Sequence, residues 1–228
     1  MSERPELRRL DELTWPEAEA LCGATLLIPL GSCEQHGPHL PLDTDTRIAV
    51  ALAERAATGL DAVALGPTLA LGSSGEHAAF PGTLSIGTEA LTTVLVELVR
   101  SAIPPFGRVV LVNGHGGNVA ALSAAVSIAD EEGRSLIVWS PSVPDADAHA
   151  GWFETSILLA LDPGTVRLDR VEPGTTTPLA ELLPALRTDG VRPHAPTGVL
   201  GDPTLATPER GAHLLEQLTS SLRTLLTT

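Results

Sequence analysis

The chain is 228 residues long, 43% hydrophobic and 18% charged, which favours one domain over residues 1–228 with a continuous core. Its formal net charge of -14 at pH 7 argues against nucleic acid and anionic membranes as partners. No run reaches the roughly 18 apolar residues of a membrane span, the N-terminus has no apolar signal core, and two cysteines are too few for a disulfide framework. We therefore expect a cytoplasmic protein.

Apolar runs alternate with helical patterns along the chain. Strands are predicted at 24–30, 62–65, 108–112 and 135–140. Helices are predicted near 15–22, 45–58, 88–103, 118–132, 152–161 and 208–226. Because continuously apolar strands are separated by helices, we expect an α/β fold whose mostly parallel sheet is covered on both faces. The Pro- and Gly-rich stretch 162–201 is predicted to be irregular, as a hairpin or a subunit contact.

Three polar segments follow predicted strands, at 31–47, 113–118 and 145–154. In open parallel sheets, ligands bind outside the carboxyl ends of the strands. We therefore expect the three segments to meet at one edge of the sheet.

The first polar segment offers carboxylate and imidazole ligands suited to zinc, manganese or ferrous iron. Glu34 and His36 are two residues apart, so an extended backbone points both to the same side. Asp45 lies at a predicted helix start and is placed to bridge two metals with its two oxygens. The alternative makes Asp43 or Asp45 a helix N-cap and His36 a hydrogen-bonded loop residue. For Glu34, His36 and Asp45 together, we favour a metal site.

The second segment, Asn-Gly-His-Gly-Gly-Asn at 113–118, contains both asparagines of the chain and has two interpretations. It could cradle a phosphate at a helix N-terminus. It lacks the spacing G-x-G-x-x-G, however, and a chain without lysine has no Walker A motif. The alternative is a tight turn whose glycines allow close backbone approach and present His115 to a metal. We favour the second interpretation.

The third segment leads into a predicted helix. We expect His149 to donate a proton or stabilise an oxyanion, and Glu154, one turn into the helix, to ligate a metal. Both residues are counted among the catalytic ones. The alternative interpretation is a charged first turn that complements the helix dipole.

The loop 73–77 is a further polar stretch that follows a strand. Its spacing is not G-x-S-x-G, which argues against a nucleophilic serine. The expected substrate contacts are Ser74, Glu76 and His77 of this loop, together with Gly116.

Taken together, the motifs resemble the creatininase family of metal-dependent amidohydrolases. The matching segments are Gly-Ser-Cys-Glu-Gln-His-Gly-Pro-His-Leu-Pro-Leu-Asp-Thr-Asp-Thr from 31, Asn-Gly-His-Gly-Gly-Asn from 113, His-Ala-Gly-Trp-Phe-Glu-Thr-Ser from 149, and 198–207. The resemblance implies a three-layer α/β/α fold, a dinuclear metal centre and a homo-oligomer, often a hexamer. It also implies that Glu34 and His115 hold one metal, that His36 holds the other, and that Asp45 bridges them.

Two departures from the family pattern bear on the substrate. Gly117 stands where creatininase proper has a glutamate ligand, so we expect Glu154 to supply that ligand. Asp145 stands where creatininase has a tryptophan, which argues against creatinine as the substrate. The segments 72–91 and 198–204 instead look like the mycofactocin-system branch of the family. That resemblance implies a peptidase that releases a C-terminal, modified Val–Tyr-derived unit from a precursor peptide.

The resulting hypothesis is amide hydrolysis by water activated on two divalent ions, either Zn, Fe(II) or Mn. An alternative within enzymes is hydrolysis of a small cyclic amide or formamide. An alternative from another class is a nucleotide- or anion-binding module that uses the 113–118 loop.

Overall fold

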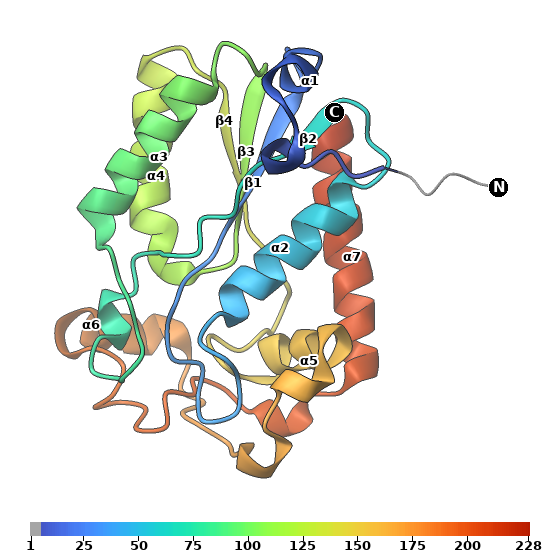
Figure 1. Ribbon diagram of the computed structural model, residues 1–228. Coiled ribbons are helices and arrows are strands. Elements are labelled where there is room, and N and C mark those ends of the chain that lie inside the picture. Colours follow the sequence, from blue (N-terminus) through green and yellow to red (C-terminus); the bar gives the residue numbers. More distant parts are fainter. Residues whose placement is uncertain (1–5) are drawn as a thin grey trace.

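The computed structural model describes residues 6–228 and contains a sheet of four parallel strands within them (Figure 1). The strands lie in the order β2-β1-β3-β4. Their bounds are β1 Thr25–Leu30, β2 Val63–Leu65, β3 Arg108–Asn113 and β4 Leu136–Trp139. All pairings are parallel, with Leu27 of β1 beside Val110 of β3. The expectation of a mostly parallel sheet is confirmed.

Seven α-helices connect and cover these strands in the described part of the chain. Their bounds are α1 Trp15–Glu19, α2 Thr44–Ala57, α3 Thr88–Ala102, α4 Val119–Glu131, α5 Trp152–Leu161, α6 Leu179–Asp189 and α7 Pro208–Thr227. The last helix begins as its sequence indicates, because the side chain of Thr207 accepts a hydrogen bond from the backbone N–H of Arg210. None of the helices within residues 6–228 is both long and apolar enough to cross a membrane.

The helices form a layer on each face of the sheet (Figure 1). Successive residues of a strand point to opposite faces, so Leu27 belongs to one core and Leu26 and Ile28 to the other. The first core packs the sheet against α2, α5 and α7. The second packs it against α3 and α4. The three-layer α/β/α fold is confirmed, and each face of the sheet buries its own set of apolar side chains.

The structure corrects the expectation for the stretch 162–201. Residues 179–189 form the helix α6 rather than irregular chain. Leu179, Leu182, Leu183 and Leu186 have helical spacing, but Pro184 inside the helix hides the pattern because proline usually breaks helices. The flanking chain forms only short 3-10 turns, and no strand of the sheet lies in the stretch.

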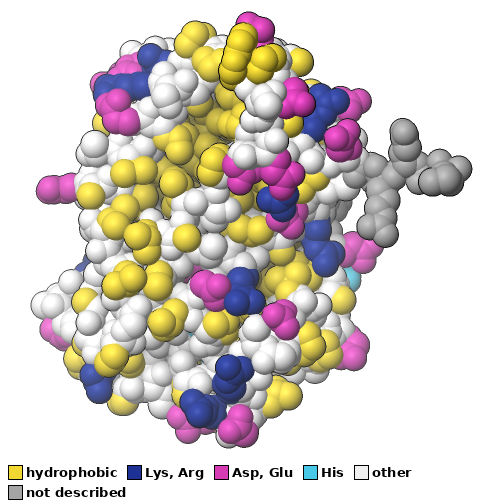
Figure 2. Space-filling model, in the orientation of Figure 1, with side chains coloured by type: hydrophobic (Ala, Val, Ile, Leu, Met, Phe, Trp, Pro, Cys, Tyr) yellow, Lys and Arg dark blue, Asp and Glu magenta, His cyan; other side chains and the backbone are white. Residues whose placement is uncertain are grey.

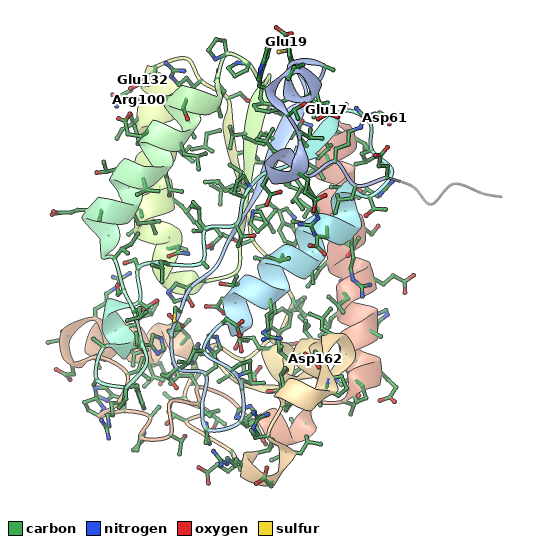
Figure 3. All side chains as sticks on the ribbon, viewed as in Figure 1. Glu17, Glu19, Asp61, Arg100, Glu132 and Asp162 are labelled. Carbon is green, nitrogen blue, oxygen red and sulfur yellow. The ribbon has the colours of Figure 1, made fainter. Side chains whose placement is uncertain are left out.

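Charged side chains join elements at the surface. Arg100, in the last turn of α3, donates hydrogen bonds of 2.9 and 3.1 Å to the carboxylate of Glu132 just beyond α4 (Figure 3). Figure 2 shows acidic side chains scattered over one face of the molecule, while hydrophobic side chains gather on its upper half, over and beside α3. Val94 of α3 is among the exposed ones.

Candidate active site

The polar segments that follow β1 and β3 meet beyond the carboxyl ends of these strands, as parallel neighbours require. Glu34 and His36 come from the loop after β1, and Asp45 from the first turn of α2. His115 lies in the loop after β3, and His149 lies just before α5. All five side chains are buried. The structure therefore brings together the four expected metal ligands of the first two segments and the expected proton donor.

Asp45 lies at the centre of this group. Its Oδ1 is 2.9 Å from Nε2 of His36, and its Oδ2 is 3.1 Å from Nδ1 of His115. The hydroxyl of Ser32 donates to Oδ2 at 2.7 Å. Asp45 is therefore not a helix cap, because its side chain turns inward between two imidazoles. Asp43 occupies the N-cap position of α2 and pairs with Arg47 instead.

Glu34 is fully buried, and neither carboxylate oxygen has a hydrogen-bond partner among residues 6–228. Its Oε2 lies 3.1 Å from Nε2 of His115. Its Oε1 lies 3.5 Å from Nε2 of His77 and 3.6 Å from Nδ1 of His149. A buried carboxylate without hydrogen bonds costs several kcal/mol unless a cation compensates it. These oxygens are thus placed for a cation.

The ligand atoms fall into sets that can each hold one ion. Glu34, Asp45 and His115 form one set, and His36, Asp45 and Glu154 form another, with all ligand atoms of a set within 4.8 Å of one another. Glu34, His36 and His149 form an overlapping third set. Nitrogen and oxygen donors of this kind suit zinc, manganese and ferrous iron. The residues therefore fit divalent metal ions, and the first two sets share Asp45.

Burial and neighbouring charges shift the ionisation of every candidate ligand. Burial raises the pKa of both Glu34 and Glu154 to about 7. Burial lowers the pKa of a histidine, but at two histidines nearby carboxylates outweigh this effect. Asp45 raises the pKa of His36 to about 10, and Glu34 raises the pKa of His115 to about 9. The pKa of Asp45 is held well below its usual range because His36 and His115 outweigh the effect of burial.

Gln35, which no motif in the sequence singled out, connects two histidines of the site. Its Oε1 accepts from the N–H of Gly37 at 2.9 Å, and its Nε2 donates to the carbonyl of Gly198 at 3.0 Å. These backbone partners determine which end of the amide is nitrogen. Nε2 also donates to Nδ1 of His77 at 2.8 Å. His77 must therefore carry its own proton on Nε2, the atom that faces Glu34.

The backbone of Gln35 sets the opposite arrangement at His149. Nε2 of His149 donates to the carbonyl of Gln35 at 2.8 Å, which leaves Nδ1 free and facing Glu34. Burial lowers the pKa of His77 to about 3, helped by the charge on His115. Burial also lowers the pKa of His149 well below its usual range, helped by the charge on His36. Both imidazoles are therefore neutral at pH 7. Glutamine occurs only twice in the chain. This scarcity is the feature of the sequence that could have indicated a specific role for Gln35.

The two asparagines hold the loops of the site together. Asn113 donates to the carbonyl of His115 at 2.9 Å. Asn118 donates to the carbonyl of Gly31 at 3.1 Å and accepts from the N–H of Ser73 at 2.9 Å. The asparagines thus hold the backbone of these loops in position. The nearby carboxylates of the site make this loop a poor place for a phosphate.

Gly117, the position at which the family resemblance implies a glutamate ligand in creatininase proper, has no room for a side chain. A Cβ there would lie 2.3 Å from the carbonyl oxygen of Ser73 and 2.4 Å from Nε2 of His115. Glu154 instead reaches the second set from α5, with Oε2 3.8 Å from Nε2 of His36. The same oxygen accepts from the N–H of Ala150 at 2.6 Å, which holds the carboxylate in place.

A cavity of about 440 Å³ opens beside the candidate metal ligands. Its polar side includes Glu76, His77, Gly116, His115 and His149, so three of the four expected substrate contacts line it. Ser74, the fourth, is fully buried, and its hydroxyl lies 3.4 Å from Nε2 of His115. Ser74 thus contacts the candidate ligand His115 and is not part of the cavity lining.

Comparison with known proteins gives consistent relatives. The family model described as creatininase, creatinine amidohydrolase, matches residues 11–226. The mycofactocin precursor peptide peptidase of Mycolicibacterium smegmatis is 54% identical over 200 residues, which cover 85% of this chain and 80% of the relative. The creatinine amidohydrolase of Pseudomonas putida is 33% identical over 240 residues, 90% of each chain.

Solved structures agree with these relatives. A manganese creatininase superposes with a TM-score of 0.79 at 28% identity, covering 97% of this chain and 98% of its own. A mutant creatininase of Zn-Zn type superposes with a TM-score of 0.77 at 28% identity, covering 97% of each chain.

Proposed function

Because the chain belongs to the creatininase family and is an amidohydrolase that breaks C–N bonds, we propose that it is a two-metal peptidase acting on a modified precursor peptide. The observation that carries the two-metal part is Asp45, whose carboxylate belongs to two ligand sets at once. Glu34 and His115 complete one set, and His36 and Glu154 complete the other.

Divalent ions bound here would activate water and polarise the scissile carbonyl. The protein's own contribution centres on His149. Its Nε2–H is held by the carbonyl of Gln35, so Nδ1 is the atom that takes a proton from the attacking water. The same nitrogen then delivers this proton to the departing amine as the C–N bond breaks. His149 lines the cavity, which supports a proton transfer to a substrate bound there.

The peptide substrate is supported by the relative of Mycolicibacterium smegmatis, whose name specifies a precursor peptide. The cavity of about 440 Å³ lies in the usual range of about 300–1,000 Å³ for ligand-binding pockets, so it has room for a short segment of such a peptide. We propose that the C-terminal Val–Tyr-derived unit is the released fragment. Gly117 and Asp145 stand against a creatinine-type substrate, because both depart from the creatininase pattern.

We further propose that the protein works as a homo-oligomer. Val94 of α3 is 41% exposed and Trp15 of α1 is 77% exposed. Figure 2 shows hydrophobic side chains gathered on the upper half of one face. Exposed apolar patches of this kind often mark surfaces that another chain covers. The expected hexamer stays a prediction.

The test is a pair of matched substitutions. Asp45→Asn should lose bound metal and peptide hydrolysis together, because one side chain serves both ligand sets. Asp43→Asn, two residues earlier and paired with Arg47 at the surface, should keep both. His149→Ala should keep the metal while turnover falls by roughly 10²–10⁴-fold. Metal content by mass spectrometry and cleavage of the modified peptide provide the readouts. An Asp45→Asn protein that is fully loaded and active would refute the two-metal assignment.

A further inference from the structure

The cavity lining also includes apolar side chains, which take no part in the proposed hydrolysis. Leu179, Leu183 and Leu186 lie at i, i+4 and i+7 on one face of α6, and all three line the cavity that His77, His115 and His149 also line. Other apolar side chains join them in the lining, namely Val119, Val191 and Leu200. The cavity lining therefore combines the polar groups of the candidate site with these apolar side chains, which we call the α6 wall.

Two of the α6 leucines are unusually exposed for residues that face inward. Leu179 is 41% exposed and Leu183 is 37% exposed, whereas Leu186 is 6% exposed and anchors α6 in a small core with Val191. Burying a leucine is worth about 1.5–3 kcal/mol relative to leaving it exposed. A ligand that covers the α6 wall gains this energy, and nothing else in residues 6–228 covers it.

The α6 wall is fixed in position relative to the polar groups of the candidate site. The N–H of Val191, just after α6, donates to the carbonyl of Glu76 at 2.8 Å. His149 and Leu200 pair by two backbone hydrogen bonds of 2.9 and 3.2 Å. Each contact joins a residue of the α6 wall to a polar residue of the cavity lining. A substrate in the cavity can thus contact both at once.

We propose that the α6 wall is the specificity subsite for the released fragment and takes bulky aliphatic or aromatic side chains adjacent to the scissile amide. This inference rests on the proposed function, in which the fragment is a Val–Tyr-derived unit. Such a unit carries one branched aliphatic and one aromatic side chain, which matches a wall of leucine and valine. Arg187 also lines the cavity and offers N–H donors to the oxygens of the fragment.

The test compares two peptides that share every residue before the scissile amide. One ends in Val-tyramide and the other in Ala-methylamide. Wild-type protein should cleave the first with the higher kcat/KM. Leu183→Ala should lower kcat/KM for the Val-tyramide peptide by roughly 10- to 200-fold, the range for lost apolar contacts in a pocket. The same variant should leave the Ala-methylamide peptide within about twofold, because that peptide does not reach the leucine.

Leu168→Ala is the matched control, since Leu168 is 65% exposed and does not line the cavity. This variant should leave kcat/KM unchanged for both peptides. The inference is overturned if wild type cleaves both peptides equally, or if Leu183→Ala slows both alike, and the peptidase function then still stands. If wild type cleaves neither peptide, the proposed function fails.

A binding measurement decides the subsite without any hydrolysis. Calorimetry with free Val-tyramide and free Ala-methylamide should show tighter binding of the first to wild type, and a loss of that preference in Leu183→Ala. Equal binding of the two compounds to wild type would remove the subsite. Circular dichroism of the variant confirms that α6 and the rest of the fold are kept.

Discussion

Glu34 illustrates how single side chains define the candidate site. Its two oxygens are buried without hydrogen bonds, and burial raises its pKa to about 7. Its neighbours include His115, whose pKa is raised to about 9 mainly by Glu34 once burial is overcome. Without a bound cation, the charges of Glu34 and His115 therefore change only when these residues gain or lose protons. This leads to two predictions at the scale of the residue.

The first residue-scale prediction concerns proton release on metal binding. A histidine ligates through a neutral nitrogen, yet the raised pKa of His36 at about 10 and of His115 at about 9 leaves both protonated at pH 7. Glu34 and Glu154, with pKa about 7, are half protonated there. Adding Zn²⁺ or Mn²⁺ to metal-free protein should therefore release protons at pH 7.

Because these protons leave as the pH rises towards 10, metal affinity should increase from pH 6 to pH 9 while the number of protons released falls. Calorimetry in two buffers of different ionisation enthalpy measures that number. Metal binding at pH 7 with no net proton release would contradict the assigned ligands.

The second residue-scale prediction concerns Gln35. Gln35→Glu keeps the shape and the acceptor for Gly37 but removes the donor to Nδ1 of His77. A carboxylate there favours a protonated His77, so the pKa of His77 should rise and the acid limb of the kcat profile should move to higher pH. We expect activity to fall by about 10–100-fold, the usual effect of losing a partner that orients a site histidine.

Gln217→Glu is the control, because this other glutamine is exposed on α7. It should leave the pH profile unchanged. If Gln35→Glu lowers activity without moving the profile, Gln35 has a packing role only.

At the scale of elements, the site depends on where strands end and helices begin. β1 and β3 are neighbours in parallel, so the loops with Glu34 and His115 emerge side by side. The first turn of α2 then supplies Asp45. The start of α5 is held by Asp147, whose carboxylate accepts from the N–H groups of Trp152 at 2.7 Å and Phe153 at 3.1 Å. It also accepts from the N–H of Asp202 at 3.1 Å.

Asp147→Ala should therefore loosen the start of α5, between His149 and Glu154. We expect a loss of about 0.5–2 kcal/mol of stability, as for other helix caps. Turnover should fall as well at temperatures where the protein stays folded, because both flanking side chains lose their backbone support. Asp202→Ala is the control, since it removes only the cap of the short turn Pro203–Leu205. Equal turnover in the two variants would show that Asp147 serves stability alone. Urea unfolding and steady-state rates give the two readouts.

At the scale of the whole molecule, the buried charges couple metal binding to folding. The candidate ligands come from segments as far apart in sequence as Glu34 and Glu154, so an unfolded chain does not present them together. Metal should thus bind the folded protein and stabilise it. That residues 1–228 form one domain stays a prediction.

Removal of the metal with a chelator should lower the Tm, and Zn²⁺ or Mn²⁺ should restore it. At an ion concentration of about 100 Kd, binding contributes about 2.7 kcal/mol. For a chain of this size, 1 kcal/mol corresponds to roughly 2–4 °C, so we expect a fall of roughly 5–10 °C. Asp45→Asn should show the same Tm with and without chelator. A wild-type Tm that does not respond to metal would count against the site.

The fold class and most of the site were accessible from the sequence because their signals are local. Apolar runs and helical spacing predicted all four strands and every helix except α6, where Pro184 hid the leucine stripe. The helix predicted near 15–22 is shorter in the structure, where α1 ends at Glu19. Short motifs likewise named Glu34, His36, Asp45 and His115, and the family resemblance they carry is confirmed.

Only the tertiary structure decided how these residues face one another. Contacts such as the hydrogen bond from His149 to the carbonyl of Gln35, 114 residues apart, leave no periodic trace in a sequence. Asp45 belongs to two ligand sets, Gly117 has no room for a side chain, and α6 lines the cavity. Each of these facts arises because segments distant in sequence lie close together in space. Spacing along a chain specifies which residue types are available, whereas burial and distance between distant segments determine what they can do.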